Sequence, residues 1–197
     1  ADGCHREFFL RRLQFASPWR RIRLRLNPLH YVLLWLEKNT YSPKNTRAVI
    51  ALSHRVKTEI IRHYHFPAEQ IYPIHNGVDL ERFKLNPPRK ETGKFVLLFV
   101  GSGFERKGLQ FCIKALAQLP ANVELHVVGK GSIRLYQRLA EKLGVASRVI
   151  FRGPIQNVEI IYPEADILVH PAIYEPFGNV VLEAMACGLP VVVTAGG

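Results

Sequence analysis

Two glutamates near the end of the sequence have the spacing of a ligand-binding pair. Glu175 stands directly before a predicted helix start, and Glu183 lies inside that helix among almost wholly apolar neighbours. A charge in such a helix needs a partner or a ligand. Free amides at a helix start receive phosphate, and carboxylates accept hydrogen bonds from sugar hydroxyls. The pattern predicts two acids that flank a diphosphate; the alternative is a helix-start anion and a surface residue.

A glycine-rich loop, residues 101–108, offers a second anion site. It follows a predicted strand, and Gly101 and Gly103 allow its backbone to approach a ligand. Arg106 and Lys107 place two positive charges near a helix start, which is unfavourable for the helix alone. A diphosphate would remove this conflict, whereas the alternative is that both side chains point into water. The loop completes neither a dinucleotide-binding fingerprint nor a Walker A motif, because it lacks the third glycine and the Ser or Thr after the lysine.

The second half of the sequence alternates apolar strands with helices, which predicts an α/β fold with a Rossmann-like parallel sheet. The predicted strands are 95–100, 123–128, 148–151, 167–169 and 190–194. The predicted helices are 107–119, 133–143, 158–162 and 178–187. Ligands of such sheets bind beyond the carboxyl ends of the strands, so the loops 101–106, 129–132, 152–156 and 170–177 are the ones expected to carry a site.

The first part of the sequence has a different organisation. Helical spacing runs from Leu29 to near Asn39, and a second helix is predicted over 54–64 with Ser53 as its cap. Strands are predicted at 47–53 and 70–75. The polar stretch 84–94, which contains two prolines, is the best linker, so we expect residues 1–83 and 95–197 to belong to different domains. The missing initial methionine and the final glycine turn lead us to expect an interior fragment of a longer protein.

Most of the excess positive charge lies near the beginning. Residues 1–65 carry 13 of the 27 Lys and Arg residues but only 4 of the 16 acidic residues. A basic, aromatic-rich segment of this kind attracts anionic lipid or phosphorylated glycans; the alternative is a solvated face whose arginine stems cover apolar surface. No usual nucleic-acid motif is present, so we expect no nucleic-acid partner. The arginines in question are Arg11, Arg12, Arg20, Arg21, Arg23 and Arg25.

The cysteines favour a reducing compartment. Cys4, Cys112 and Cys187 are an odd number, widely spaced, and form no CxxC pair. His63 and His65 lack the further ligands of a metal site. No apolar run reaches the ~18 residues of a membrane span. We therefore expect a cytoplasmic protein, located either free or at the inner face of the cytoplasmic membrane.

Taken together, these motifs resemble the retaining GT-B glycosyltransferases of family 4, group 1. Glu175 and Glu183 resemble the EX7E motif of that family, and the loop 101–108 resembles its donor loop. The stretch 76–79 (Asn-Gly-Val-Asp), followed by Phe83, resembles the end of its first domain. The amino-acid sequences of residues 101–108, 116–120 and 140–145 resemble most the lipopolysaccharide-core glucosyltransferases. The family's amino-terminal glycine loop and acceptor-side histidine are not recognisable.

The resemblance implies a role for each matching residue. Arg106, Lys107 and Glu175 would be the catalytic residues. Arg106 and Lys107 would bind the donor diphosphate and steady the leaving nucleotide, and Glu175 would contact the donor sugar. Glu183 would hold the ribose. Further donor-binding positions are Gly101, Gly103, Arg152, Pro154, Ile155, Phe177, Gly178 and Asn179. No metal or other cofactor is expected, because the cationic pair and the helix end take its place.

The activity that the resemblance implies is transfer of a hexose, with glucose as the best candidate, from a UDP-sugar to a saccharide or lipid-linked saccharide. Residues 1–83 would be the end of an acceptor-side domain and 95–197 an incomplete donor domain, so we expect the fragment alone to be inactive. The alternatives are another GT-B enzyme, such as a phosphorylase or a nucleotide-sugar epimerase, and a non-catalytic nucleotide- or glycan-binding module at an anionic membrane.

Overall fold

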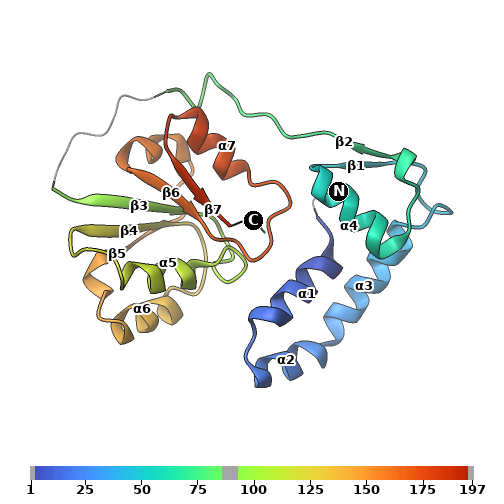
Figure 1. Ribbon diagram of the computed structural model, residues 1–197, viewed down its shortest axis with the longest axis horizontal. Coiled ribbons are helices and arrows are strands. Elements are labelled where there is room, and N and C mark those ends of the chain that lie inside the picture. The colour runs from blue at the N-terminus through green and yellow to red at the C-terminus, as the bar shows by residue number, and fades with distance from the viewer. Residues whose placement is uncertain (1–2, 86–92, 195–197) are drawn as a thin grey trace. The chain divides into compact units, whose positions relative to one another are not determined.

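The computed structural model describes residues 3–85 and 93–194, and these form two compact units. The first unit is Ala1–Asn76 together with the short segment Ile173–Phe177, and the second is Gly77–Ala172 together with Gly178–Gly197. Figure 1 shows the elements of both units, which are described separately below.

The first unit combines four helices with a small parallel sheet. Strand β1 (Val49–Ala51) pairs with β2 (Ile71–Pro73), and helix α4 (His54–Tyr64) connects them through the 3-10 turn η1 (Ala68–Gln70). A core that includes Val56, Ile60 and Phe66 lies beneath α4. The predicted cap of α4 is confirmed, because the Ser53 hydroxyl accepts a hydrogen bond of 3.2 Å from the amide of Val56.

The three preceding helices are α1 (His5–Phe15), α2 (Pro18–Arg25) and α3 (Pro28–Thr40). Pro18 and Pro28 occupy the first positions of α2 and α3, where the missing amide hydrogen costs nothing. Asn27 caps α3 by accepting a hydrogen bond of 3.0 Å from the amide of Leu29. The two prolines therefore divide this basic stretch into separate helices.

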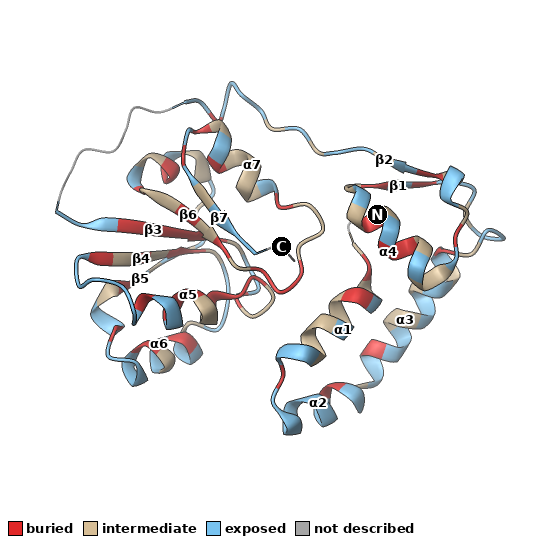
Figure 2. Ribbon diagram, viewed as in Figure 1, coloured by how far each residue is buried: buried red, intermediate tan, exposed pale blue. Residues whose placement is uncertain are grey.

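The second unit is a parallel five-stranded sheet in the order β5-β4-β3-β6-β7. Its strands are β3 (Phe95–Val100), β4 (Val123–Val128), β5 (Val149–Gly153), β6 (Ile167–His170) and β7 (Val191–Val193). Alternate residues of β3 pack on opposite faces: Leu97 and Phe99 lie in one core cluster, while Val96 and Leu98 lie in the other. Both faces of β3 are thus buried, and Figure 2 draws most of this strand in red.

Helices cover both faces of this sheet. Helices α5 (Leu109–Leu116) and α6 (Ile133–Lys142) pack on the first cluster. Helix α7 (Asn179–Ala186) packs on the second, together with the 3-10 turns η3 (Val158–Ile160) and η4 (Tyr162–Glu164). The further 3-10 turn η2 (Ala146–Arg148) leads into β5. The predicted α/β fold with a parallel sheet is confirmed.

Two helix predictions need correction. The segment 158–162 is not an α-helix but the turns η3 and η4, because Pro163 lacks an amide hydrogen and restricts Tyr162 before it. Helix α5 begins at Leu109 rather than Lys107, because Gly108 adopts the left-handed conformation with φ 77° and serves as the N-cap. Arg106 and Lys107 therefore lie in the turn before the helix.

The units divide at Asn76 and Gly77, a few residues before the predicted linker 84–94. Residues 86–92 of that linker lie outside the described residues, so the linker stays a prediction. The segment Ile173–Phe177 belongs to the first unit, although its position in the sequence is within the predicted donor domain.

Replacing Gly108 by alanine tests how closely the backbone before α5 packs against Pro171. A Cβ atom there would lie far inside van der Waals contact with the carbonyl oxygen of Pro171, and φ is +77°. Gly144 has φ +69° but no heavy atom within 4 Å of its Cβ position. Gly144→Ala should cost about 1–2 kcal/mol from strain alone, and Gly108→Ala should cost about 1–3 kcal/mol more from overpacking. Urea unfolding measures both, and equal losses would contradict the close approach.

Candidate functional site

The glycine loop between β3 and α5 is fixed by hydrogen bonds to the neighbouring strand end. The amide of Gly101 donates to the carbonyl of Val128 at 2.9 Å, and the amide of Gly103 donates to the carbonyl of Lys130 at 2.9 Å. In return, the Lys130 amide donates to the Ser102 hydroxyl at 3.1 Å. The loop thus lies along the carboxyl ends of the strands, where ligands of parallel sheets bind.

Lys107 is the buried cation of this loop. Only 8% of the residue is exposed. A Cβ atom at Gly101 would lie 3.2 Å from Lys107 Cγ and 3.3 Å from Cε, so the lysine stem lies on the backbone at the end of β3. The alternative in which Lys107 points into water is therefore wrong, whereas Arg106 is half-buried. A buried ammonium group interacts with an anion more strongly than one in water.

Glu183 has a partner that the sequence did not reveal. The hydroxyl of Tyr162 donates to Glu183 Oε2 at 2.6 Å, and the tyrosine is 1% exposed. Burial, followed by the nearby Glu183 carboxylate, raises the pKa of Tyr162 well above its usual range, so the hydroxyl remains a donor. The tyrosine therefore satisfies the charge within the apolar helix and orients the carboxylate.

The start of α7 confirms the predicted helix boundary. Gly178 is buried and left-handed with φ 88°, and it occupies the N-cap, while Asn179 begins the helix and is exposed. Val181 donates its amide to the carbonyl of Gly178 at 2.9 Å.

The predicted loop at 152–156 begins later than expected. Strand β5 continues through Arg152 and Gly153, because the Gly153 carbonyl accepts a hydrogen bond of 2.9 Å from the Gly129 amide. Arg152 forms an ion pair with Glu164. Pro154 is exposed and Ile155 is half-buried against the core cluster beneath α7. The loop residues proper are thus Pro154 and Ile155.

The other candidates lie in the first unit. Glu175 is half-buried, and Phe177 places its ring 5.7 Å from that of His75. The structure therefore brings Gly101, Gly103, Arg106, Lys107, Arg152, Pro154, Ile155, Gly178, Asn179 and Glu183 into the second unit, and places Glu175 and Phe177 in the first.

The six basic-segment arginines do not share one environment. Arg11 pairs with Glu7 at 2.8 Å, and Arg12 lies over the ring of Phe8 at 5.9 Å. Arg21 donates to the carbonyl oxygens of Ala16 and Gln14 near the end of α1. Arg20, Arg23 and Arg25 are exposed on α2. Arg11, Arg12 and Arg21 thus contact groups in or beside α1, and Arg20, Arg21, Arg23 and Arg25 contribute to an exposed basic surface on α2.

The first unit contains a cavity that the sequence did not predict. This cavity of about 680 Å³ has Arg6, Trp35 and His63 in its wall, but none of the predicted donor-binding residues. Within residues 3–85 and 93–194, no three His, Cys, Asp or Glu side chains are grouped to hold a metal ion.

No helix in the described part of the chain is long and apolar enough to cross a membrane. Burial raises the pKa of the Cys112 thiol to about 12, as expected for an inert cysteine.

Comparison with known families gives two adjoining matches. Residues 81–197 match the model of the glycosyl transferases group 1, and residues 3–82 match that of glycosyltransferase family 4. The lipopolysaccharide glucosyltransferase WaaG of Escherichia coli is 34% identical over 99% of this chain and 54% of its own length. The chain thus spans about half the length of this relative.

Solved structures show the same relationship. A crystal structure of WaaG matches with a TM-score of 0.80 and 33% identity, over 100% of this chain and 55% of that one. The Anabaena protein Alr3699/HepE in complex with UDP-glucose matches with a TM-score of 0.73 and 26% identity, over 88% of this chain and 50% of that one.

The bond between Tyr162 and Glu183 should contribute to stability. Tyr162→Phe removes the hydroxyl and leaves a partly buried carboxylate with one donor fewer. We expect a loss of about 1–2 kcal/mol in the free energy of unfolding, measured with urea. Tyr72→Phe is the control, because its ring is exposed. Equal stability of the two variants would show that the bond is unimportant.

Proposed function

This chain belongs to the glycosyl transferases of group 1, and from that membership we propose that the whole protein transfers a hexose from a nucleotide diphosphate sugar, with retention of configuration. The fold and family expected from the sequence are both confirmed by the GT-B relatives. The observation that carries the proposal is Lys107, whose buried stem lies on Gly101 at the carboxyl end of β3.

The chemistry needs stabilisation of negative charge more than a strong base. The bond from the anomeric carbon of the sugar to the diphosphate oxygen breaks, and a bond from that carbon to the acceptor hydroxyl oxygen forms. The electron pair stays with the departing nucleotide diphosphate, so negative charge develops on its phosphate oxygens before the acceptor's proton is transferred to it. A fixed ammonium group in a site of low dielectric stabilises this charge without reorganisation. Lys107 would meet the diphosphate together with the half-buried Arg106, and we expect no metal requirement.

The remaining donor contacts are the ones that the resemblance to the family implies. Glu183, oriented by Tyr162, would accept hydrogen bonds from the ribose, and Glu175 would contact the sugar hydroxyls. Gly178 and Asn179 would offer backbone contacts at the start of α7, together with Phe177, while Gly101 and Gly103 leave room for the donor. The base would lie against Pro154 and Ile155, because Arg152 is engaged with Glu164.

UDP-glucose is the donor that the relatives favour. HepE was solved with UDP-glucose, and WaaG is named a lipopolysaccharide glucosyltransferase. We therefore propose a glucosyl donor and a saccharide or lipid-linked saccharide acceptor for this protein, acting in the cytoplasm at the membrane face.

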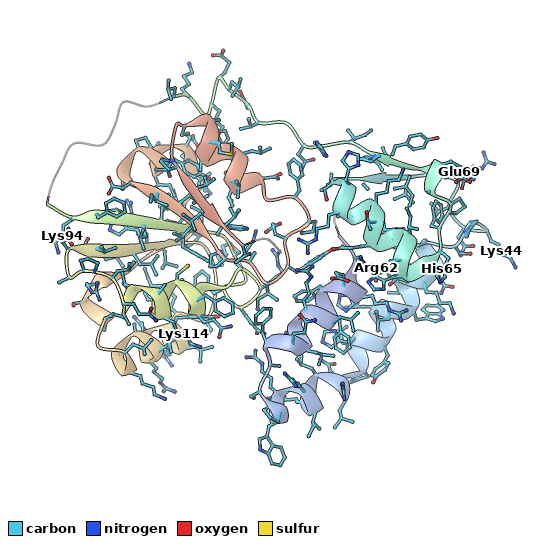
Figure 3. The ribbon with its side chains drawn as sticks, viewed as in Figure 1. Lys44, Arg62, His65, Glu69, Lys94 and Lys114 are labelled. Atoms are coloured by element: carbon cyan, nitrogen blue, oxygen red, sulfur yellow. The ribbon has the colours of Figure 1, made fainter. Side chains whose placement is uncertain are left out.

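Replacing Lys107 tests the donor site. Lys107→Met keeps an apolar stem of similar length over Gly101 but removes the charge. We expect UDP binding, measured by titration calorimetry, to weaken about 10- to 100-fold, since hydrogen bonds to charged groups are worth about 1.5–3 kcal/mol. Lys114→Met is the matched control, because Lys114 is exposed on α5 (Figure 3). Equal UDP affinity of both variants would refute the proposed site.

Helix α2 supports the membrane part of the proposal. Trp19, Ile22 and Leu26 follow helical spacing and are exposed, with 84% of Trp19 accessible. Arg20, Arg23 and Arg25 are exposed on the same short helix. Exposed aromatic and aliphatic side chains beside arginines suit the interface of an anionic bilayer.

Charge reversal on α2 tests this surface. The double variant Arg20→Glu and Arg23→Glu should weaken binding to vesicles containing phosphatidylglycerol by at least about 30-fold, since each basic residue contributes ~1 kcal/mol. UDP binding should not change. The pair Arg134→Glu and Arg138→Glu on α6 makes the same change in net charge elsewhere, and equal loss in both variants would mean that only net charge matters.

A further inference from the structure

The segment Ile173–Phe177, here called the glutamate loop because it contains Glu175, has unusual packing. Its chain neighbours Ala172 and Gly178 belong to the second unit, yet the loop itself belongs to the first. Ile173 and Tyr174 are both buried. The first unit must therefore supply the contacts that hold Glu175 in place.

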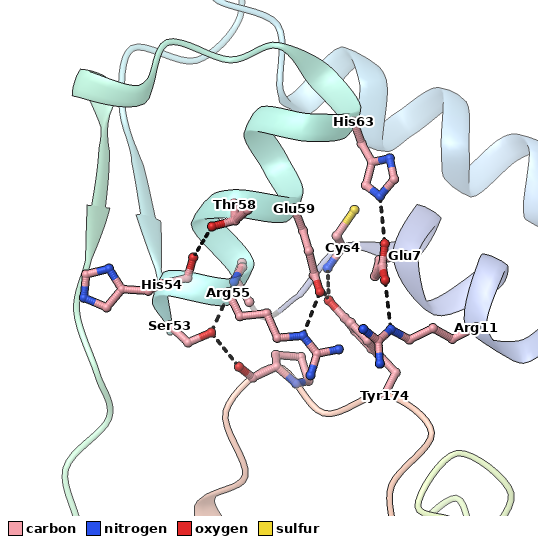
Figure 4. Close-up of polar contacts among 12 residues, drawn as sticks. Cys4, Glu7, Arg11, Ser53, His54, Arg55, Thr58, Glu59, His63 and Tyr174 are labelled. Carbon is pink, nitrogen blue, oxygen red and sulfur yellow. Dashed lines mark hydrogen bonds and ion pairs between the residues drawn. The ribbon is translucent and has the colours of Figure 1, made fainter. Parts of the chain in front are cut away.

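Tyr174 is the main anchor on one side of Glu175. Its hydroxyl donates to Glu59 Oε2 at 2.6 Å and accepts a hydrogen bond of 2.7 Å from the Cys4 amide (Figure 4). Burial is the largest of the effects that raise the pKa of Tyr174 above its usual range, so the hydroxyl stays protonated as the donor. The tyrosine is 4% exposed, so the whole ring is committed to this contact.

Glu59 and Arg55 complete the anchor. Glu59 is a buried carboxylate on α4, only 3% exposed. Arg55 Nε donates to its Oε1 at 2.9 Å, and the Arg55 guanidinium lies 5.2 Å from the centre of the Tyr174 ring. Because an isolated buried charge is costly, the cluster is stable only when tyrosine, glutamate and arginine are all in place.

Two further contacts hold the loop on the other side of Glu175. The hydroxyl of Ser53, which also caps α4, donates to the carbonyl of Pro176 at 2.8 Å (Figure 4). Gly3 approaches so closely that a Cβ atom there would lie 2.6 Å from Pro176 Cγ. Glu175 is therefore fixed between two anchored neighbours.

We propose that Tyr174, Glu59 and Arg55 are positioning residues for Glu175, and that they set the contribution of the donor sugar to binding. This inference rests on the proposed function, in which Glu175 contacts the sugar. None of the three needs to touch the donor, because they act by fixing the backbone on which Glu175 stands. Without the Tyr174 hydroxyl, the buried Glu59 loses a donor and the loop loses its anchor.

The test is a double-mutant cycle measured by titration calorimetry of the 197-residue chain with UDP-glucose. In the wild type, Glu175→Gln should weaken UDP-glucose binding about 10-fold, the effect of losing roughly one charged hydrogen bond. In the Tyr174→Phe background the same change should have an effect below about 2-fold, because Glu175 is no longer held in place. Binding of UDP alone should change in neither background.

The outcomes separate this inference from the proposed function. An equal effect of Glu175→Gln in both backgrounds would overturn the positioning role while leaving the donor site intact. No effect in the wild type would overturn the sugar contact itself and the inference with it. Tyr72→Phe is the exposed control, in which the 10-fold effect should persist. Tyr162→Phe is the buried control. It should weaken the binding of UDP, but Glu175→Gln should still weaken UDP-glucose binding about 10-fold in this background.

A general loss of folding would not produce this pattern. If circular dichroism shows that Tyr174→Phe is unfolded, Glu59→Gln replaces it, because it keeps the side-chain shape while weakening both bonds of the cluster. In the Glu59→Gln background the effect of Glu175→Gln on UDP-glucose binding should again fall below about 2-fold, and a persisting 10-fold effect would overturn the inference.

Discussion

The candidate site depends on how closely three strand ends approach one another. The Gly101 amide donates a hydrogen bond to the Val128 carbonyl, and the Gly129 amide donates one to the Gly153 carbonyl. These hydrogen bonds join the carboxyl ends of β3, β4 and β5. A Cβ atom on Gly129 would overlap the carbonyl oxygen of Gly101. These glycines are needed for space as much as for their backbone angles. The stem of Lys107 lies against Gly101, where a Cβ atom would come within 3.2 Å of Lys107 Cγ.

Phenol–carboxylate pairs recur at both parts of the candidate site. Tyr162 donates to Glu183 in the second unit, and Tyr174 donates to Glu59 in the first. In each pair a buried hydroxyl, kept protonated by its surroundings, satisfies one carboxylate oxygen. A tyrosine ring is rigid and well packed, so it fixes the position of an acid at little entropic cost. The two pairs nevertheless serve different purposes, since Glu183 is itself a candidate ligand and Glu59 supports a neighbour.

The sequence predicted those elements whose bounds depend on local residue patterns. It did not predict the features that depend on contacts between residues far apart in the sequence. Buried apolar runs located β3 and β4 to the residue, and Ser53 marked the start of α4. The predicted start of α5 was wrong, because the spacing of apolar residues does not show that Gly108 adopts the left-handed conformation. Tyr162 and Tyr174 were missed because their partners are 21 and 115 residues away in sequence. Spacing could identify Glu183 as a charge in need of a partner, but not name the partner.

The packing of the glutamate loop limits how Glu175 can move. On the side of the second unit, the Thr194 hydroxyl donates to the Ala172 carbonyl at 3.0 Å, and the left-handed Gly178 caps α7. On the side of the first unit, Tyr174 and Pro176 are anchored. The chain therefore passes from one set of fixed contacts to the other at Ile173 and at Phe177. Glu175 thus lies between two residues that are anchored to the first unit. The position of Glu175 is therefore set by tertiary contacts of its chain neighbours, and not by the local sequence of the loop.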